Sequence, residues 1–113
     1  MVQEKKMGYL EIINIRCSNK GNEALSQFNL EKMVRDAEKE YGLKNIQLYR
    51  NASLRSDVSI HILHESSEHQ ARKSEFGLRL TASLTEFCMV NHSHWLLEED
   101  WQKFQAEGGV LVK

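Results

Sequence analysis

Histidine is the first residue type in this chain that suggests chemistry, with five copies in 113 residues. His92 and His94 alternate along one predicted strand, so their side chains share a face and lie about 6–7 Å apart at the base. An HxH pair of this kind chelates zinc or iron when a third ligand converges, for which His61, His64 and Glu11 are candidates. Because a single HxH pair is a weak signal, the preferred interpretation is half-exposed strand histidines with ordinary hydrogen bonds.

A carboxamide and several aromatic side chains are the other candidates for a binding site. Asn14 lies in the middle of the most hydrophobic segment, where an unpaired amide costs about 1–3 kcal/mol, so it faces a partner, a ligand or an adjacent loop. Arg16 lies next to it on the same strand face, and the pair is suited to a carbonyl or carboxylate group. Tyr49, Trp95 and Trp101 are candidate pocket walls, although alternating aromatics are more typical of a core or a dimer interface.

The composition disfavours several functional classes. There is no G-x-S-x-G elbow, phosphate-binding glycine loop or paired cysteine and histidine, which argues against covalent catalysis. The 15 Lys and Arg residues against 16 Asp and Glu residues give a net charge of -1, so no positive field attracts nucleic acid or anionic lipid. No apolar run is long enough to span a bilayer, and the N-terminus carries charges where a signal peptide is apolar. We expect a cytoplasmic protein with neither nucleic acid nor membrane as a partner.

Cys17 and Cys88 are the only cysteines in the sequence. They form no CxxC pair and lack the density of a disulfide-stapled secreted domain. We therefore expect two buried free thiols. A disulfide between them is the less favoured alternative, and it requires the ends of two predicted elements to meet.

The elements that position these residues are indicated by hydrophobic periodicity. Strands are predicted at 8–17, 45–50, 58–64 and 89–97. A helix is predicted at 23–41, and a second helix follows the polar segment 65–68, with its apolar face running from Phe76 to Phe87. Gly77 lies inside this second helix at a cost of about 1 kcal/mol relative to alanine, which close packing against the sheet or a ligand explains.

Alternation within the third predicted strand assigns its residues to two faces. Val58, Ile60 and Ile62 form the apolar face. Ser59 and His61 lie on the opposite face, and His64 joins the apolar face if the strand extends that far.

The order strand, helix, strand, strand, helix, strand predicts an α+β fold, a ferredoxin-like β-α-β-β-α-β sandwich. Right-handed crossovers place the first and third strands at the centre and the helices on one sheet face. Both faces of the first strand are apolar, so a second subunit is expected to cover the free face as a homodimer. We expect one domain over 1–113, with 98–113 as a tail that packs Trp101 and Phe104 on the same chain or on a partner subunit.

Two segments carry a resemblance to a known family. They are Asn14-Ile15-Arg16-Cys17-Ser18-Asn19-Lys20-Gly21, leading into the first helix, and Ser74-Glu75-Phe76-Gly77, opening the second. Over about Tyr9 to Trp95 the chain resembles the dimeric α/β-barrel superfamily, and within it the antibiotic-biosynthesis-monooxygenase type of domain, which includes quinol and haem-degrading monooxygenases. Thr81 stands where the haem-degrading branch has its helix histidine, so haem degradation is not expected.

The resemblance implies a cofactor-independent monooxygenase acting on a small aromatic or quinol substrate. In quinol-type members no metal or organic cofactor is needed, because the deprotonated substrate itself reacts with oxygen in a dry pocket. The implied catalytic residues are Asn14, which orients the substrate oxygen, and His61 or His64 as base. The candidate substrate-binding residues are Arg16, Tyr49 and Trp95. The alternatives are a non-catalytic dimeric ligand-binding or regulatory protein and a His-based metal-binding protein.

Overall fold

The computed structural model describes residues 7–18, 29–54, 56–66, 70–106 and 108–112, and these form an α+β fold. Its centre is a four-stranded antiparallel sheet of β1 (Met7–Cys17), β2 (Asn45–Arg50), β3 (Asp57–Ser66) and β5 (Cys88–Leu96). The strand order is β2-β3-β1-β5. The first and third predicted strands are therefore central, as expected, and the arrangement is compatible with a ferredoxin-like fold.

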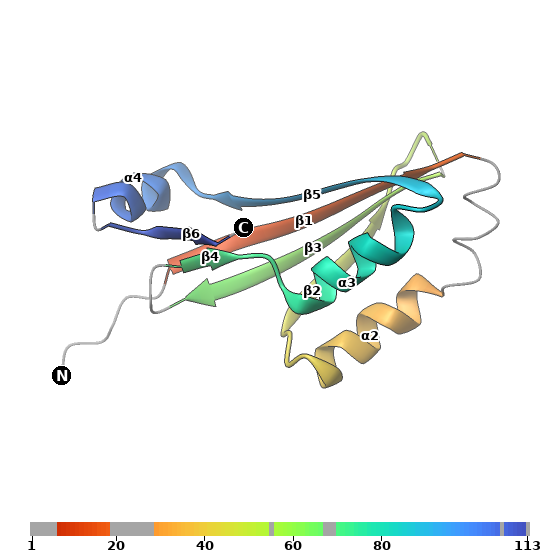
Figure 1. Ribbon diagram of the computed structural model, residues 1–113, viewed down its shortest axis with the longest axis horizontal. Helices are drawn as coiled ribbons and strands as arrows, with labels where there is room; N and C mark the ends of the chain where they lie inside the picture. Colours follow the sequence, from red (N-terminus) through yellow and green to blue (C-terminus); the bar gives the residue numbers. More distant parts are fainter. Residues whose placement is uncertain (1–6, 19–28, 55, 67–69, 107, 113) are drawn as a thin grey trace.

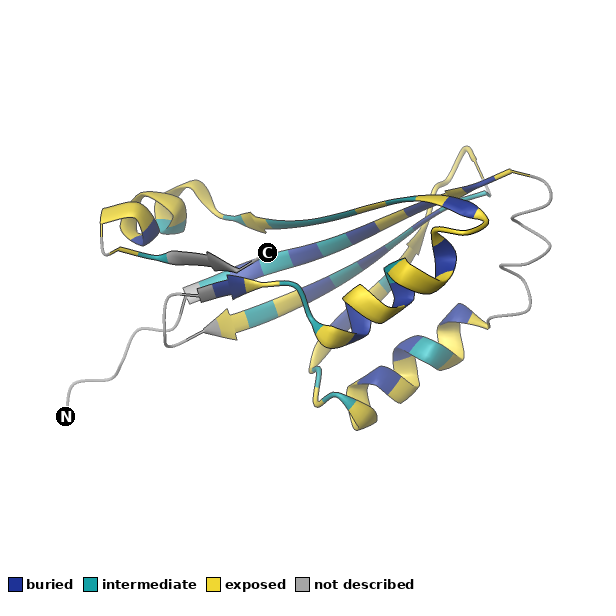
Figure 2. Ribbon diagram, in the orientation of Figure 1, coloured by how far each residue is buried: buried dark blue, intermediate teal, exposed yellow. Residues whose placement is uncertain are grey.

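Two helices, α2 (Leu30–Glu40) and α3 (Glu75–Leu84), lie on one face of this sheet (Figure 1). We call that side the covered face and the other side the open face. Helix α2 presents Leu30, Val34 and Ala37 inward at a helical spacing, and the buried positions of both helices turn toward the sheet (Figure 2). Residues 23–28, the start of the first predicted helix, lie outside the described residues.

Alternation along β1 decides which side chains enter the core. Every second residue is buried, namely Tyr9, Glu11, Ile13, Ile15 and Cys17. The residues between them point to the open face. Among the described residues, Glu11 is the only polar or charged one that is buried.

The second predicted helix begins later than the polar segment 65–68 suggested. Ser74 is its N-cap, and the Ser74 side chain accepts a hydrogen bond of 3.0 Å from the Gly77 backbone N–H. The helix ends at Leu84, so Phe87 lies beyond it. Before the helix, the chain forms β4 (Gln70–Arg72), a short strand that periodicity did not reveal.

The C-terminal residues pack on their own chain at one end of the sheet (Figure 1). Helix α4 (Glu98–Ala106) is followed by β6 (Val110–Val112), which pairs in parallel with β4. Phe104 is buried against Tyr9 and Ala71, and the Gly109 N–H donates to the Phe104 carbonyl oxygen at 2.6 Å. A second, smaller core therefore covers the outer end of β1.

The expectation of two free thiols is wrong in this structure. Cys17 and Cys88 form a disulfide with their Cα atoms 4.3 Å apart. The physical reason is the strand register, because Cys17 at the end of β1 lies directly opposite Cys88 at the start of β5. A sequence separation of 71 residues conceals this pairing.

The molecule is elongated, with extents of 53 × 26 × 25 Å. Its long axis follows β1 and β3, which extend past α2 and α3 toward α4 (Figure 1). Among the described helices, none combines the length and apolar character that crossing a membrane requires.

Candidate functional site

The structure distributes the predicted site residues over the two faces of the sheet. Asn14, Arg16, Tyr49, His61 and Trp95 belong to the open face, because their strand neighbours Ile13, Ile15, Leu48, Ile62 and Leu96 pack in the cores of the covered side. His64 joins the covered face, as predicted for a strand that extends to Ser66. The predicted catalytic residues therefore do not form one site.

On the open face, three side chains form a hydrogen-bonded row that we call the Asn14 row. The Ser59 hydroxyl donates to the Asn14 Oδ1 atom at 2.8 Å, and the His61 Nε2 and Ser59 Oγ atoms are 2.9 Å apart. Because the Ser59 hydroxyl donates its hydrogen to Asn14, the Ser59 oxygen is the acceptor in its contact with His61. The Nε2 atom of His61 therefore carries the hydrogen of that bond. The Nδ1 atom of His61 is then the ring nitrogen with a free lone pair.

A hollow of about 560 Å³, which we call the basin, is lined by Asn14 and Ser59 of this row, whereas His61 is not among its lining residues. Asn14, Tyr49, Ser59 and Asn91 contribute to its lining, and the Tyr49 ring packs against His61 with centroids 4.6 Å apart. A volume of this size suits a small aromatic molecule. The basin therefore has room for a substrate of the predicted size beside Asn14.

Arg16 lines the basin, but its guanidinium group is engaged by a carboxylate. Its Nε and Nη2 atoms donate to Asp57 at 3.0 and 2.7 Å across the β1–β3 pair. Hydrogen bonding to Arg16 lowers the pKa of Asp57. A substrate carboxylate would have to compete with Asp57 for this group.

Trp95 lies on the open face at a distance from the basin. It pairs with Leu10 across the β1–β5 ladder, and its indole N–H donates to the Ser93 hydroxyl at 2.8 Å. Tyr49, Trp95 and Trp101 are 47%, 59% and 39% exposed, so within a single chain the core interpretation of these aromatics is wrong.

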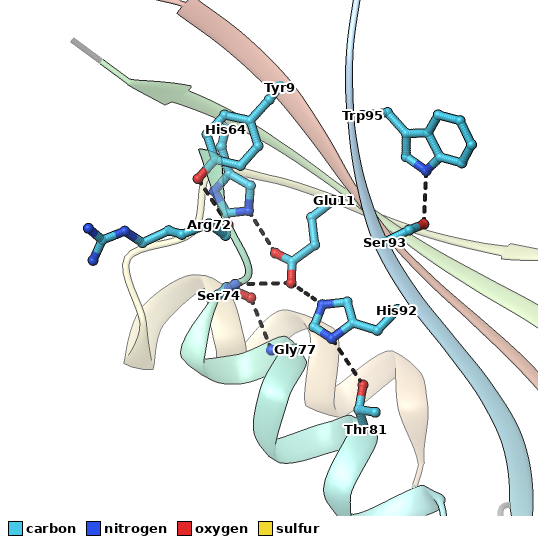
Figure 3. Close-up of polar contacts among 10 residues, drawn as sticks. All are labelled: Tyr9, Glu11, His64, Arg72, Ser74, Gly77, Thr81, His92, Ser93 and Trp95. Carbon is cyan, nitrogen blue, oxygen red and sulfur yellow. Dashed lines mark hydrogen bonds and ion pairs between the residues drawn. The ribbon is translucent and has the colours of Figure 1, made fainter. Parts of the chain in front are cut away.

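The covered face holds a second polar group, which we call the Glu11 cluster and which comprises Glu11, His64, Ser74, Thr81 and His92 (Figure 3). The Glu11 carboxylate has one oxygen 2.8 Å from His64 Nε2 and the other 2.5 Å from His92 Nε2. The backbone N–H of Ser74 donates to the second oxygen at 3.0 Å. One buried carboxylate thus joins β1, β3, β5 and the start of α3.

These contacts decide the ionisation of Glu11. Burial by itself raises the pKa of this carboxyl group, but the hydrogen bonds from His64, His92 and Ser74 outweigh it and lower the pKa to about 2. The N-terminal end of α3, with its partial positive charge, favours the same ionised form. Glu11 is therefore a carboxylate at neutral pH.

Close packing at this cluster explains the glycine inside α3. A Cβ atom at Gly77 would lie 2.3 Å from Glu11 Oε2 and 2.8 Å from His92 Nε2. Only a residue without a side chain lets the helix approach the carboxylate so closely. The prediction that packing accounts for Gly77 is confirmed.

His92 and His94 do share one face, but they have different surroundings. His92 bonds Glu11, and its Nδ1 atom lies 3.3 Å from Thr81 Oγ1. The His94 ring meets Tyr9 edge-on, and its buried Nε2 atom has no hydrogen-bond partner among the described residues. No set of three His, Cys, Asp or Glu side chains in the described ranges is arranged to hold a metal ion.

Sequence reasoning considered Glu11 only as a third metal ligand and missed its role as the centre of a network. A signal was present, since Glu11 occupies an inward position in the alternation of β1 between Tyr9 and Ile13. A charge at such a position requires partners. Their identity depends on the register of β3 and β5 beside β1, which periodicity does not give.

Comparison with known proteins finds structures of similar fold but identifies no family. No family model matches the sequence, and the search of curated proteins found no match. A conserved protein of unknown function from Bacteroides thetaiotaomicron, described as a possible oxidoreductase, is 10% identical with a TM-score of 0.59, covering 82% of this chain and 100% of that one. A Mycobacterium tuberculosis protein is 18% identical with a TM-score of 0.58, covering 80% of this chain and 94% of that one.

A conserved protein from Methanosarcina mazei has a TM-score of 0.56 at 9% identity, covering 81% of this chain and 94% of that one. At such identities the likeness concerns the fold alone. The chain thus belongs to a class of small α+β proteins with a four-stranded antiparallel sheet. One member of this class is described as a possible oxidoreductase.

Proposed function

We propose that the protein is a cofactor-independent monooxygenase of the antibiotic-biosynthesis-monooxygenase type, which oxidises a small quinol bound in the basin. The observation that carries this proposal is the Asn14 row beside a hollow of about 560 Å³. The description of the Bacteroides protein as a possible oxidoreductase agrees with the reaction class.

The residues of the row have separate roles in this reaction. Asn14 Oδ1 has a second lone pair, which accepts a hydrogen bond from the substrate hydroxyl and orients it. His61, with Nε2–H bonded to Ser59, takes the substrate proton at Nδ1. The resulting anion is rich enough in electrons to reduce oxygen.

The overall reaction balances without an added reductant. A quinol and O₂ give a hydroxyquinone and water, so one oxygen atom enters the ring and the other leaves as water. All the electrons come from the substrate. The protein has to bind the quinol, remove its proton and exclude bulk water from the basin.

A second copy of the chain provides the cover that such a reaction needs. The basin lies on the open face, and the exposed side chains of Leu63 and Trp95 lie on the same face beside Leu10, farther along the sheet. A homodimer with the two open faces opposed buries these groups and encloses both basins. His64 has no part in this mechanism, because its side chain contacts Glu11 on the other side of the sheet.

The test uses 1,4-naphthohydroquinone under ¹⁸O₂, with mass spectrometry of the 2-hydroxy-1,4-naphthoquinone formed. We expect one ¹⁸O atom per product, a rate at least about tenfold lower for Asn14→Ala, and a loss of about 100-fold for His61→Gln. Asn45→Ala is the matched control, since Asn45 is an exposed asparagine of β2 outside the basin lining.

Three outcomes contradict the proposal. Unlabelled product means that oxygen is not incorporated by the protein, and unchanged turnover in Asn14→Ala removes the row from the reaction. If the quinol binds in the basin without any turnover, the non-catalytic ligand-binding alternative replaces the monooxygenase.

A further inference from the structure

The Glu11 cluster has no part in the proposed oxygenation, although its centre is the only buried polar or charged residue among those that the structure describes. It lies on the covered face, separated from the basin by the thickness of the sheet. Glu11 is fully buried and touches two histidines through two different oxygens. Its chemistry therefore has to be considered separately.

The hydrogen bonds of the cluster define which ring nitrogens carry protons. An ionised carboxylate only accepts, so the Nε2 atoms of both His64 and His92 donate to Glu11. His92 Nδ1 is then left to accept from the Thr81 hydroxyl at 3.3 Å. His64 Nδ1 is the second acceptor nitrogen, and this arrangement resembles a carboxylate-oriented general base.

Solvent reaches this cluster at His64. The side chain of Glu11 is 0% exposed and that of His92 is 5% exposed, whereas that of His64 is 15% exposed. The His64 ring stacks on Tyr9 with centroids 4.8 Å apart, which holds it in place. The Tyr9 hydroxyl donates its hydrogen to the Arg72 carbonyl oxygen. We therefore assign Tyr9 to the wall of the site beside His64 and not to proton transfer with it.

A second observation at this end of the covered face points to an outside molecule. His94 lies opposite Glu11 in the β1–β5 ladder, and its ring meets the Tyr9 ring edge-on. Its Nε2 atom is buried and has no hydrogen-bond partner in the described structure. A buried ring nitrogen of this kind, donor or acceptor according to the tautomer, requires a hydrogen-bond partner from water or from a ligand hydroxyl.

We propose that the Glu11 cluster is a second acid–base site, in which His64 Nδ1 takes the proton of an acidic O–H group from a small phenol or enol. The O–H bond breaks, a N–H bond forms at His64 Nδ1, and the electron pair stays on the ligand oxygen as phenolate or enolate. Glu11 stabilises the imidazolium produced. The proposal is independent of the oxygenation reaction in the basin.

The probe is 4-nitrophenol, whose phenolate absorbs visible light and whose neutral form does not. At about one pH unit below the pKa of the free phenol, addition of the folded protein is expected to raise the phenolate absorbance in a saturable way. We expect at least a fivefold smaller increase with His64→Gln and with Glu11→Gln. Asn45→Ala, at an exposed position of β2 that belongs to neither site, is the control and should leave the increase unchanged.

The outcomes separate this proposal from the function proposed for the basin. An unchanged increase in His64→Gln, or its loss in Asn45→Ala, overturns the second site. If Glu11→Gln does not fold, the proposal is tested with His64→Gln and with a nitrogen NMR measurement on the wild-type protein. In ¹⁵N-labelled wild type, His64 should carry its proton on Nε2 and gain one on Nδ1 when the phenol binds, and a resting proton on Nδ1 contradicts the proposal.

Discussion

At the scale of single residues, Glu11 connects the sequence pattern of β1 to the structure, because it is a charged residue at an inward position of the strand. A charge in the apolar alternation of β1 is tolerated because three hydrogen-bond donors surround it. Removing the charge leaves two histidine donors and a backbone N–H turned toward a neutral group. The stability of the whole sheet at low pH therefore depends on this carboxylate.

Replacing Glu11 with Gln should change the acid sensitivity of folding. The pKa of Glu11 is about 2 in the folded protein against 4.5 for an unperturbed glutamate, so the folded state binds this proton less readily than the unfolded chain. The stabilisation is fully present above about pH 4.5 and is lost as the pH falls toward 2, with a magnitude of about 3 kcal/mol. Urea unfolding of wild type and Glu11→Gln between pH 7 and 2.5 measures it.

The stability difference between the two proteins should shrink through this window as the wild-type carboxylate becomes protonated. Glu75→Gln is the control, because Glu75 is an exposed carboxylate at the start of α3. A difference that stays constant from pH 7 to pH 2.5 would show that the charge of Glu11 does not contribute.

Gly77→Ala tests the close approach of α3 to the cluster. Alanine is about 1 kcal/mol better than glycine within a helix, but here its Cβ atom would overlap Glu11 Oε2 and His92 Nε2. We expect a net loss of about 1–3 kcal/mol in the free energy of unfolding. Ala82→Gly on the exposed side of the same helix is the control and should cost about 1 kcal/mol; a stabilised Gly77→Ala protein would contradict the packing.

Individual residues were predictable to the extent that a single strand determines them. Alternation placed His61 and His64 on opposite faces and His92 and His94 on one face, and the structure agrees. The bond between Asn14 and Ser59 and the convergence of two histidines on Glu11 were not predictable. They depend on the register between strands, for which a single sequence carries no direct signal.

At the scale of elements, the strands of the main sheet were predictable and the short non-local elements were not. β2 is found at its predicted residues, and β1, β3 and β5 lie within two residues of theirs. β4 and β6 each have three residues and pair with each other across α3, β5 and α4. Three residues are too few for a periodic pattern, so only tertiary contacts define these strands.

The disulfide that joins β1 to β5 should contribute strongly to stability. It closes a loop with a sequence separation of 71 residues, for which chain entropy gives about 4 kcal/mol. Urea unfolding with and without dithiothreitol measures the contribution, and the midpoint should fall on reduction. The double variant Cys17→Ser/Cys88→Ser is the control and should not respond to dithiothreitol; an identical midpoint for oxidised and reduced wild type would contradict the bond.

Phe104 connects the C-terminal elements to the sheet. Phe104 is 4% exposed and packs with Tyr9 and Ala71, so Phe104→Ala should cost about 3 kcal/mol. Hydrogen exchange should increase first in α4 and in the β4–β6 pair, while α2 stays protected. Trp101→Ala, which removes a more exposed ring of the same helix, is the control; equal losses for both variants would mean that burial of Phe104 is not the cause.

At the scale of the whole molecule, one sheet separates two polar sites of different character. The basin is open and depends on cover from outside, whereas the Glu11 cluster lies between α3 and the small core around Phe104 and meets solvent at His64. The open face also carries apolar groups beyond the basin. Leu10 lies between Leu63 and Trp95 in the sheet, and these two neighbours are 50% and 59% exposed. An apolar group of this kind on a sheet face is suited to a second sheet.

Leu63→Lys should therefore convert a dimer into a monomer. Light scattering at tens of micromolar is expected to give twice the chain mass for wild type and the single chain mass for this variant, because a lysine at the centre of two opposed sheets would be buried without a partner. Leu78→Lys is the matched control, since Leu78 is similarly exposed on α3 and faces away from the sheet. If the dimer encloses the basin, Leu63→Lys should also lose oxygenation of 1,4-naphthohydroquinone while the phenolate signal of the Glu11 cluster persists. A monomeric wild type, or a dimeric Leu63→Lys protein, would show that the open face is not the interface.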